Sequence, residues 1–232
     1  MKKVLKFLLI KLPLAVILLS VLSVFVLKWV PVKVTPLIVS RSIEFRKDTT
    51  FHTSKQWCKL EDISPELIKA VIVSEDSHFL EHKGFDYEAI RRALERRKTE
   101  GVVRGASTIS QQTAKNVFTF HKRTFWRKGI EAWFTFLIER IWGKERIMEV
   151  YLNVAEMGKG IYGAQAAAQA FFKKDAAALT RREASTLAAS LPAPLKQNAD
   201  HPTTALRNRT AAISRMIPDL KYPDWVEHKE QE

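Results

Sequence analysis

The strongest hydrophobic pattern is an apolar run close to the amino terminus. Residues 12–27 have the sequence L-P-L-A-V-I-L-L-S-V-L-S-V-F-V-L and carry no charge. Neighbouring apolar residues extend this run, interrupted only by Lys11 and Lys28. About 20 helical residues span the roughly 30 Å apolar core of a bilayer, and terminal lysines can reach the head groups. The pattern predicts one transmembrane helix, which together with the lysines before it occupies residues 1–30.

The charges around this helix predict its orientation. Lysines 2, 3, 6 and 11 precede its core and Lys28 alone closes it, so the positive-inside rule places the N-terminus in the cytoplasm. The main alternative is a cleavable signal peptide, which has an apolar region of about 7–15 residues and a small-x-small cleavage site. Here W-V-P-V-K follows the run instead. We therefore expect a retained single-pass anchor in the cytoplasmic (inner) membrane and an extracytoplasmic, periplasmic domain after it.

The pattern changes after the anchor. Residues 31–60 contain two prolines and two short β-prone stretches, V-K-V-T (32–35) and L-I-V (37–39). They predict an extended connector with a short strand pair. From Ser64 onward a helical period dominates, and S-P-E at 64–66 supplies an N-cap, a proline at the first helical position and an early acid.

Further helix signals continue to the end of the chain. Thr108 with Gln111, and Thr180 with Glu183, have the spacing of capping boxes. Apolar residues recur at helical spacing over residues 126–142, two prolines stop a helix near residue 192, and residues 205–216 form the last expected helix. The fold class is therefore mostly α, with one domain over residues 61–232 behind one transmembrane helix.

Composition and charge narrow the candidate functions. Hydrophobic residues make up 46% and charged residues 27%, as in a folded domain, and only 8 glycines argue against a turn-rich all-β fold. The net charge is +13, of which five lysines in residues 1–28 account for five, leaving +8 for the rest. Such an excess favours anionic partners, namely nucleic acid, acidic lipid head groups or phosphorylated substrates. The lone Cys58 permits no internal disulfide and is expected to be structural, and no Cys/His cluster predicts a metal site.

Two segments carry the groups that chemistry would need. In residues 75–86, an acidic pair ends one predicted helix and is followed by an aromatic residue, histidines, glycine and a further acid. A carboxylate there could act as a general base, although an acidic pair at a helix end is more often a solvated surface feature. In residues 105–116, small and hydroxyl residues lead into a helix whose free N–H groups could receive an anion, or could simply be capped.

A third segment adds cations and a second acid. Arg123, Arg127 and Lys128 precede Glu131, which lies four residues after Arg127. Taken alone, this spacing is typical of a surface ion pair that contributes a few tenths of a kcal/mol.

The order and spacing of these segments are more specific than any one of them. The chain contains E-D-S-H-F-L-E-H-K-G-F-D (75–86), G-A-S-T-I-S-Q-Q-T-A-K-N (105–116), R-K-G-I-E (127–131), K-E-R-I-M-E-V-Y-L-N (144–153), G-K-G-I-Y-G (158–163) and L-T-R-R-E-A-S-T-L-A-A-S-L-P-A-P (179–194). In these stretches it resembles the monofunctional peptidoglycan glycosyltransferases, relatives of the glycosyltransferase domain of bifunctional penicillin-binding proteins. The resemblance covers residues 61 to about 217. Ala106 replaces a common glycine and Ser110 a common threonine.

The resemblance implies an inverting reaction and a role for each matching residue. Family members join the 4-hydroxyl of lipid II to a lipid-linked growing glycan and release undecaprenyl pyrophosphate. Glu75 matches the acid that deprotonates the acceptor hydroxyl, and Glu131 matches a second essential acid near the donor's pyrophosphate. The substrate-binding residues implied are Asp76, Phe79, His82, Thr108, Gln112, Lys115, Asn116, Arg123, Arg127 and Lys128. The implied fold is lysozyme-like, with an apolar subdomain that dips into the membrane.

The chemistry of this reaction agrees with the residues present. A pyrophosphate leaving group needs fixed cations more than a proton donor, and arginine and lysine provide them. A single in-line displacement needs one base and one cationic clamp. No cofactor is required by these residues, although a divalent cation (Mg²⁺ or Mn²⁺) is a candidate to assist the pyrophosphate. The expected partners are lipid II, lipid-linked glycan, the membrane and other cell-wall synthesis or division proteins, and not nucleic acid.

Three alternatives remain open. A lytic enzyme could share the lysozyme-like fold, but it needs a proton-donating acid and no phosphate clamp. A bitopic protein that binds nucleic acid or acidic lipid would suit the basic charge but would not need Glu75 and Glu131. A catalytically inactive relative could serve as a scaffold. Since only about 40 residues follow Pro192, we expect no transpeptidase module, and cross-linking would fall to another protein.

Overall fold

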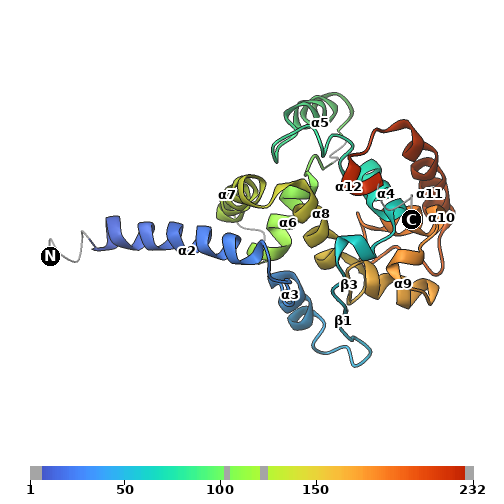
Figure 1. Ribbon diagram of the computed structural model, residues 1–232, viewed down its shortest axis with the longest axis horizontal. Helices are drawn as coiled ribbons and strands as arrows, with labels where there is room; N and C mark the ends of the chain where they lie inside the picture. Colours follow the sequence, from blue (N-terminus) through green and yellow to red (C-terminus); the bar gives the residue numbers. More distant parts are fainter. Residues whose placement is uncertain (1–6, 102–104, 121–124, 228–232) are drawn as a thin grey trace.

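The computed structural model describes residues 7–101, 105–120 and 125–227 of the chain and is mostly helical, as the sequence predicted (Figure 1). The helices are η1 (Phe7–Lys11), α2 (Leu12–Leu27), α3 (Pro36–Glu44), η2 (Leu60–Asp62), α4 (Pro65–Glu75), α5 (Tyr87–Glu100), α6 (Ile109–Phe118), α7 (Phe125–Ile141), α8 (Gly143–Val154), α9 (Ala164–Phe172), η3 (Ala176–Ala178), α10 (Arg181–Ser190), α11 (Thr204–Met216), η4 (Ile217–Asp219) and α12 (Asp224–Glu227). Three short strands, β1 (Ser54–Lys55), β2 (Glu156–Gly158) and β3 (Ile161–Tyr162), form one sheet in the order β1-β3-β2. The sequence patterns did not predict this sheet.

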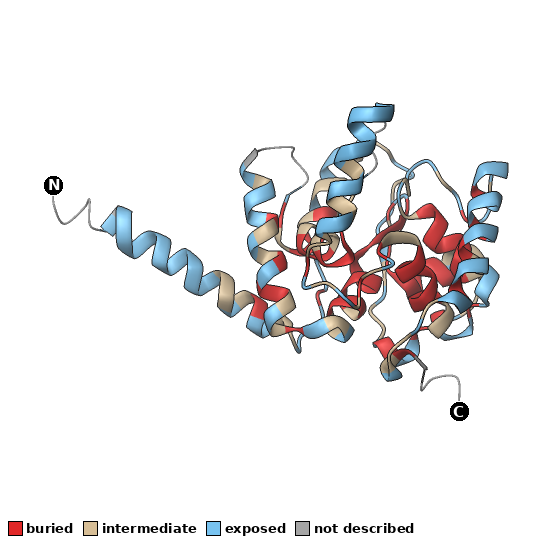
Figure 2. Ribbon diagram, turned by 90° about the horizontal axis from the view of Figure 1, so that it is seen from above, coloured by how far each residue is buried: buried red, intermediate tan, exposed pale blue. Residues whose placement is uncertain are grey.

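The core of the body is built around α4. Its residues 67–73 are all buried, because α10, α11 and α12 pack around it. Six of these seven residues are apolar and the seventh, Lys69, lies over the Tyr222 ring, so this helix belongs in the centre of the domain. Figure 2 shows the buried segments gathered in the body, whereas α2 is exposed over most of its length. Glu75, at the last position of α4, is therefore held at the end of the central buried helix.

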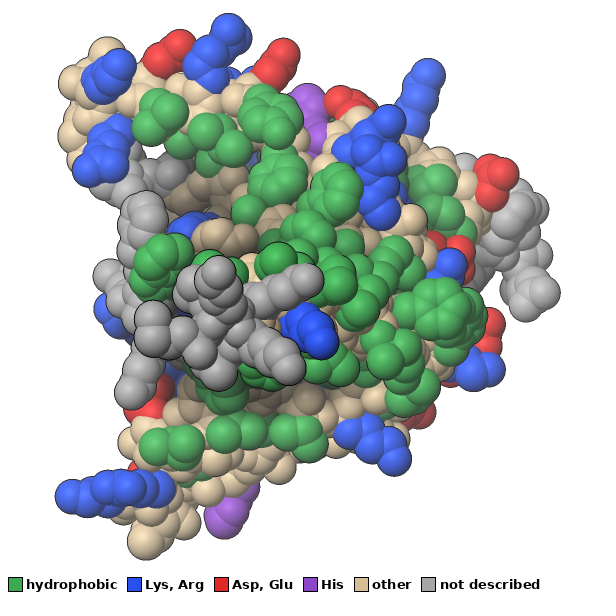
Figure 3. Space-filling model, turned by 90° about the vertical axis from the view of Figure 1, so that its left-hand side faces the viewer, with side chains coloured by type: hydrophobic (Ala, Val, Ile, Leu, Met, Phe, Trp, Pro, Cys, Tyr) green, Lys and Arg blue, Asp and Glu red, His purple; other side chains and the backbone are tan. Residues whose placement is uncertain are grey.

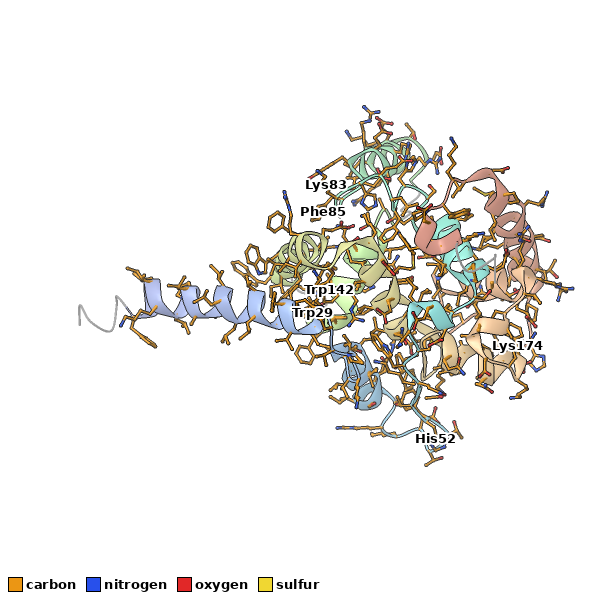
Figure 4. All side chains as sticks on the ribbon, viewed as in Figure 1. Trp29, His52, Lys83, Phe85, Trp142 and Lys174 are labelled. Carbon is orange, nitrogen blue, oxygen red and sulfur yellow. The ribbon has the colours of Figure 1, made fainter. Side chains whose placement is uncertain are left out.

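The apolar N-terminal helix projects from the body (Figure 1). The 19 residues Leu9–Leu27 are long and apolar enough to cross a membrane, and 6% of this stretch is buried. At the base of α2, the Trp142 indole donates a hydrogen bond to Val24 O at 2.7 Å, and Arg146 Nη2 donates to Leu27 O and Val30 O at 2.8 Å each. Trp29 and Trp142 both lie near the base of α2, where it meets the body (Figure 4). The end of the anchor is thus bonded to α8 and to Trp142, the residue between α7 and α8.

Exposed apolar side chains gather on the face from which α2 projects. Viewed from that side, hydrophobic groups cover much of the surface (Figure 3). Trp126, Ile130, Trp133 and Phe136 of α7 are all exposed, Trp126 by 80%. A patch of this kind on a soluble surface usually marks an interaction site.

The connector differs from its expected form. Residues 37–39 belong to the helix α3 and residues 32–35 form no strand, so the expected strand pair is wrong. The Thr35 hydroxyl accepts a hydrogen bond from Ile38 N at 3.3 Å, and Pro36 occupies the first helical position. These two start signals outweigh the β propensity of the residues that follow.

Other expected helix signals are confirmed, with two differences in detail. Both capping boxes are present, at Thr108–Gln111 and Thr180–Glu183. Ser64 precedes α4 as expected, but its hydroxyl donates to Leu179 O at 2.8 Å instead of capping the helix. The short helix α12 follows the helix that was expected to be the last.

Candidate active site

Glu75 lies where the buried helix α4 ends, and its side chain is 10% exposed. It borders a cavity of about 550 Å³ together with Gly105 and Ser107, which precede α6. The acidic pair is therefore not the solvated feature that such pairs usually are. Glu75 and Asp76 point to different surroundings, because the helix ends between them.

Asp76 ties the 75–86 segment to the start of α6. Its carboxylate accepts hydrogen bonds from His82 Nε2 at 3.0 Å and from Ile109 N at 3.0 Å. The Gly84 N–H donates to His82 Nδ1 at 3.1 Å, which assigns the remaining ring proton to Nε2. Thr108 Oγ1 donates to Gly84 O at 2.7 Å. These hydrogen bonds of Asp76, His82 and Thr108 hold the wall of the cavity in place. The Asp76 carboxylate also lies at the N-terminus of α6, where a negative group stabilises the helix.

Gly84 is required by this arrangement. Its φ of +95° lies in the left-handed region, and a Cβ there would meet Thr135 and Glu139 of α7 at 3.0 Å. The close approach brings the 75–86 segment against α7.

A hydrogen-bond chain orients Glu75. Gln112 Nε2 donates to Glu75 Oε2 at 3.0 Å, and the buried Tyr151 hydroxyl donates to Gln112 Oε1 at 3.3 Å. Tyr151 thereby fixes which way the amide of Gln112 faces. Burial raises the pKa of Tyr151 well above its ordinary value, so its hydroxyl remains a donor. The sequence patterns indicated Gln112 but missed Tyr151, which comes from α8.

Arg209 is a second residue that sequence reasoning missed. It comes from α11, to which no function was assigned. Arg209 Nη2 lies 3.8 Å from Glu75 Oε1, donates to Ser74 Oγ at 3.2 Å, and borders the same cavity as Glu75. Arg209 thus places a positive charge beside the Glu75 carboxylate.

A second cavity of about 200 Å³ adjoins the first. Gln112 and Pro192 border both, and Lys115, Asn116 and Tyr151 line the second. Glu75 and Lys115 are thus placed at the two ends of one cleft, with Gln112 between them.

Glu131 is buried among cations. Its side chain is 3% exposed, Lys128 Nζ lies 2.6 Å from Oε1, and Arg127 Nη1 lies 3.5 Å from Oε2. The alternative of an ordinary surface ion pair is therefore wrong for Glu131. Arg127 Nε and Glu131 Oε2 are both buried, yet neither makes a hydrogen bond to any residue that the structure describes. Buried polar atoms without partners need an explanation, and an additional ligand would supply it.

Lys115 of α6 belongs to the same group of charges. Burial lowers the pKa of Lys115, the charges of Arg127 and Lys128 lower it further, and the charge of Glu131 opposes them. The cluster of Lys115, Arg127, Lys128 and Glu131 joins two segments that are separate in the sequence.

The remaining predicted residues are placed as follows. Asn116 is buried and lines the second cavity. Phe79 is fully buried, with Lys144 Nζ 4.5 Å from the centre of its ring, so it supports the site and presents no surface to a substrate. Arg123 lies outside the described residues, so its predicted role stays a prediction.

The chain is similar to known proteins over most of its length. A model of the family described as "Transglycosylase" matches residues 44–217. The "Biosynthetic peptidoglycan transglycosylase" of Pseudomonas entomophila is 48% identical over 208 residues, which is 89% of this chain and 88% of the relative. Proteins with the same description from Caulobacter vibrioides (48% over 195 residues, 84% of this chain and 83% of the relative) and Shewanella oneidensis (47% over 210 residues, 90% of each) are also similar.

Proposed function

We propose the substrates and the residue roles of this chain, which belongs to the transglycosylase family. As a peptidoglycan glycosyltransferase, it polymerises glycan strands. Its substrates are lipid II and a lipid-linked growing glycan. The observation that carries this proposal is the cleft with Glu75 at one end and Lys115 at the other. A lytic enzyme acting on finished glycan would have no use for a phosphate clamp.

Glu75 is the general base in this proposal. It removes the proton from the 4-hydroxyl of lipid II while that oxygen attacks the anomeric carbon of the donor. The bond from this carbon to the phosphate oxygen breaks, and the electron pair leaves with undecaprenyl pyrophosphate. Support comes from Gln112 and Arg209, which hold the carboxylate in place beside the cavity. Because attack and departure occur on opposite faces, the configuration inverts.

The cation cluster stabilises the departing charge. Lys115, Arg127 and Lys128 receive the donor's pyrophosphate, and we assign Arg123 to the same role. Charge-assisted hydrogen bonds to phosphate are stronger than neutral ones, and a cleft that excludes water strengthens them further. Glu131 orients Arg127 and Lys128 in this scheme.

The residues around Glu131 do not fit a resident metal ion. Mg²⁺ and Mn²⁺ prefer several oxygen ligands, whereas here cations surround one carboxylate, and the described residues contain no group of three or more His, Cys, Asp or Glu that could hold a metal. We propose that any divalent cation that assists the reaction enters with the pyrophosphate.

The membrane supplies the lipid-linked substrates. Trp133 of α7 donates a hydrogen bond to Ser20 Oγ at 2.9 Å, and Ser20 precedes Leu27 by seven residues, or roughly 10 Å of helix. If α2 spans the bilayer, the apolar side chains of α7 then lie at the depth of the outer leaflet. We propose a cytoplasmic N-terminus, a periplasmic catalytic domain and an α7 face immersed in lipid, with other cell-wall synthesis or division proteins as partners.

The test is to incubate purified full-length protein with lipid-linked disaccharide pentapeptide and to look for polymer by gel electrophoresis. Preformed, lipid-free glycan is the parallel substrate. We expect polymer from the first and no release of sugar from the second. Digestion of lipid-free glycan without any polymer formation would favour the lytic alternative instead.

A further inference from the structure

The connector helix α3 contributes a charged residue to the cleft that the scheme above does not use. Arg41 lines the cavity of about 200 Å³ together with Lys115 and Asn116. Its side chain is 14% exposed, which is low for an arginine in a segment that leads from an anchor to a domain. The cavity therefore has cations on two of its walls, from α3 and from α6.

Two carboxylates hold the guanidinium of Arg41. Arg41 Nε donates to Glu156 Oε2 at 2.9 Å, and Nη1 donates to Glu44 Oε2 at 2.6 Å. The third nitrogen, Nη2, donates to none of the residues that the structure describes. Since Nε and Nη1 fix the plane of the group, the hydrogens of Nη2 have a set direction. A guanidinium with one nitrogen left over is suited to a further oxygen ligand.

Next to Arg41, burial and hydrogen bonds fix the side chain of Glu156. Its side chain is 5% exposed, and it receives a hydrogen bond from the Gly160 backbone and contacts the Tyr162 hydroxyl at 3.5 Å. Burial raises the pKa of Glu156, while the charge of Arg41 lowers it. Buried ion pairs often contribute little to stability because desolvation offsets the attraction. A role in positioning Arg41 accounts for the pair better than stability does.

We propose that Arg41 is a substrate-binding residue that forms, with Lys115, a two-cation site for the pyrophosphate of the lipid-linked substrate. The inference rests on the proposed function, because that function places a pyrophosphate in this cleft. Arginine is the appropriate cation, since its planar group can hold Glu156 and a phosphate oxygen together. The connector is then part of the binding site and not merely a tether.

The experiment compares two readouts in full-length protein in detergent. The first is the KM and kcat of polymerisation with lipid-linked substrate, and the second is calorimetric binding of inorganic pyrophosphate. The key variant is Arg41→Gln with Glu156→Gln, which removes the cation without leaving a buried carboxylate unpaired. We expect pyrophosphate binding to weaken at least about tenfold and KM to rise by a similar factor, with a smaller change in kcat.

Arg46→Gln is the matched control, because Arg46 is exposed and lies five residues further along the chain. It should leave both readouts unchanged. Should the double variant fail to fold, Arg41→Lys keeps the charge without the planar group and should weaken pyrophosphate binding several-fold. Normal KM and normal pyrophosphate binding in a folded Arg41 variant would overturn the inference. Arg41-dependent pyrophosphate binding in a protein that makes no polymer would support the site and reject the proposed function.

Discussion

Gln112 and Glu75 are joined by a hydrogen bond of 3.0 Å from the amide nitrogen to the carboxylate, although 37 residues separate them in the sequence. The other carboxylate oxygen, Glu75 Oε1, accepts a hydrogen bond from Ser74 Oγ at 3.3 Å and lies 3.8 Å from Arg209 Nη2. Gln112, Ser74 and Arg209 therefore hold the two oxygens of this carboxylate in place at the edge of the cavity.

Glu75→Gln should abolish polymerisation and preserve the fold. Glutamine keeps the size of the side chain and an oxygen that can face Gln112, but it cannot accept the proton. We expect a loss of about 10²–10⁴-fold or more in initial rate with lipid-linked substrate. Glu81→Gln is the control, because Glu81 is an exposed acid six residues further on. Near-normal turnover by the Glu75 variant would remove this residue from the mechanism.

Lys115→Ala should slow polymerisation at least about tenfold, because a charge-assisted bond to the leaving pyrophosphate is lost. No acid lies three or four residues from Lys115 in the sequence, and Glu131, which lies near it in space, retains Lys128 as a partner. Helix content measured by circular dichroism should not change. Lys98→Ala, on the exposed face of α5, serves as the control. Equal rates for the two variants would argue against the phosphate clamp.

Tyr151→Phe should lower kcat by roughly two- to tenfold, the effect of one net hydrogen bond. Without the hydroxyl, the amide of Gln112 is free to turn its oxygen toward Glu75. KM should change little, because Tyr151 acts through Gln112. The measurement is steady-state kinetics with lipid-linked substrate. A variant with unchanged kcat would show that Gln112 is oriented in some other way.

A reporter fused after residue 232 should be active if it requires the periplasm and silent if it requires the cytoplasm. This follows from the four lysines that precede the apolar run. The reverse pattern of reporter activity would place the domain away from its proposed substrates.

Removal of divalent cations with EDTA should reduce the polymerisation rate without changing the thermal unfolding midpoint. The reason is that a cation carried by the pyrophosphate contributes to turnover, whereas a resident ion would also stabilise the fold. Parallel rate and melting measurements with and without added Mg²⁺ test this. A lower midpoint in EDTA would indicate a metal site within the protein.

Local signals in the sequence predicted much of this fold. The apolar run, the capping boxes and the helical spacing over residues 126–142 each depend on neighbours within a few positions, and the structure contains all three. The strand expected at residues 37–39 failed because a Thr-Pro helix start preceded it. The small sheet was missed because its strands have two or three residues, too few for a pattern.

The candidate site was only partly predictable for a different reason. Glu75 and Gln112 stand in recognisable segments, whereas Tyr151, Arg209 and Arg41 reach the cleft from α8, α11 and α3 through packing alone. The burial of Glu131 likewise depends on helices that surround it, and its spacing from Arg127 is the same as in an exposed pair. Contacts between residues that lie far apart in the sequence produce no local sequence pattern, so a single sequence does not reveal them.

The hydrogen bonds at the base of α2 have a mechanical consequence. A transmembrane helix adjusts its tilt when the thickness of the bilayer changes. Because Trp142 and Arg146 fasten the last turn of this helix to the body, the body must turn with the helix. The height of Glu75 above the lipid surface then depends on the thickness of the membrane. The distance from Glu75 to a substrate with its lipid tail in the same membrane depends on that thickness too.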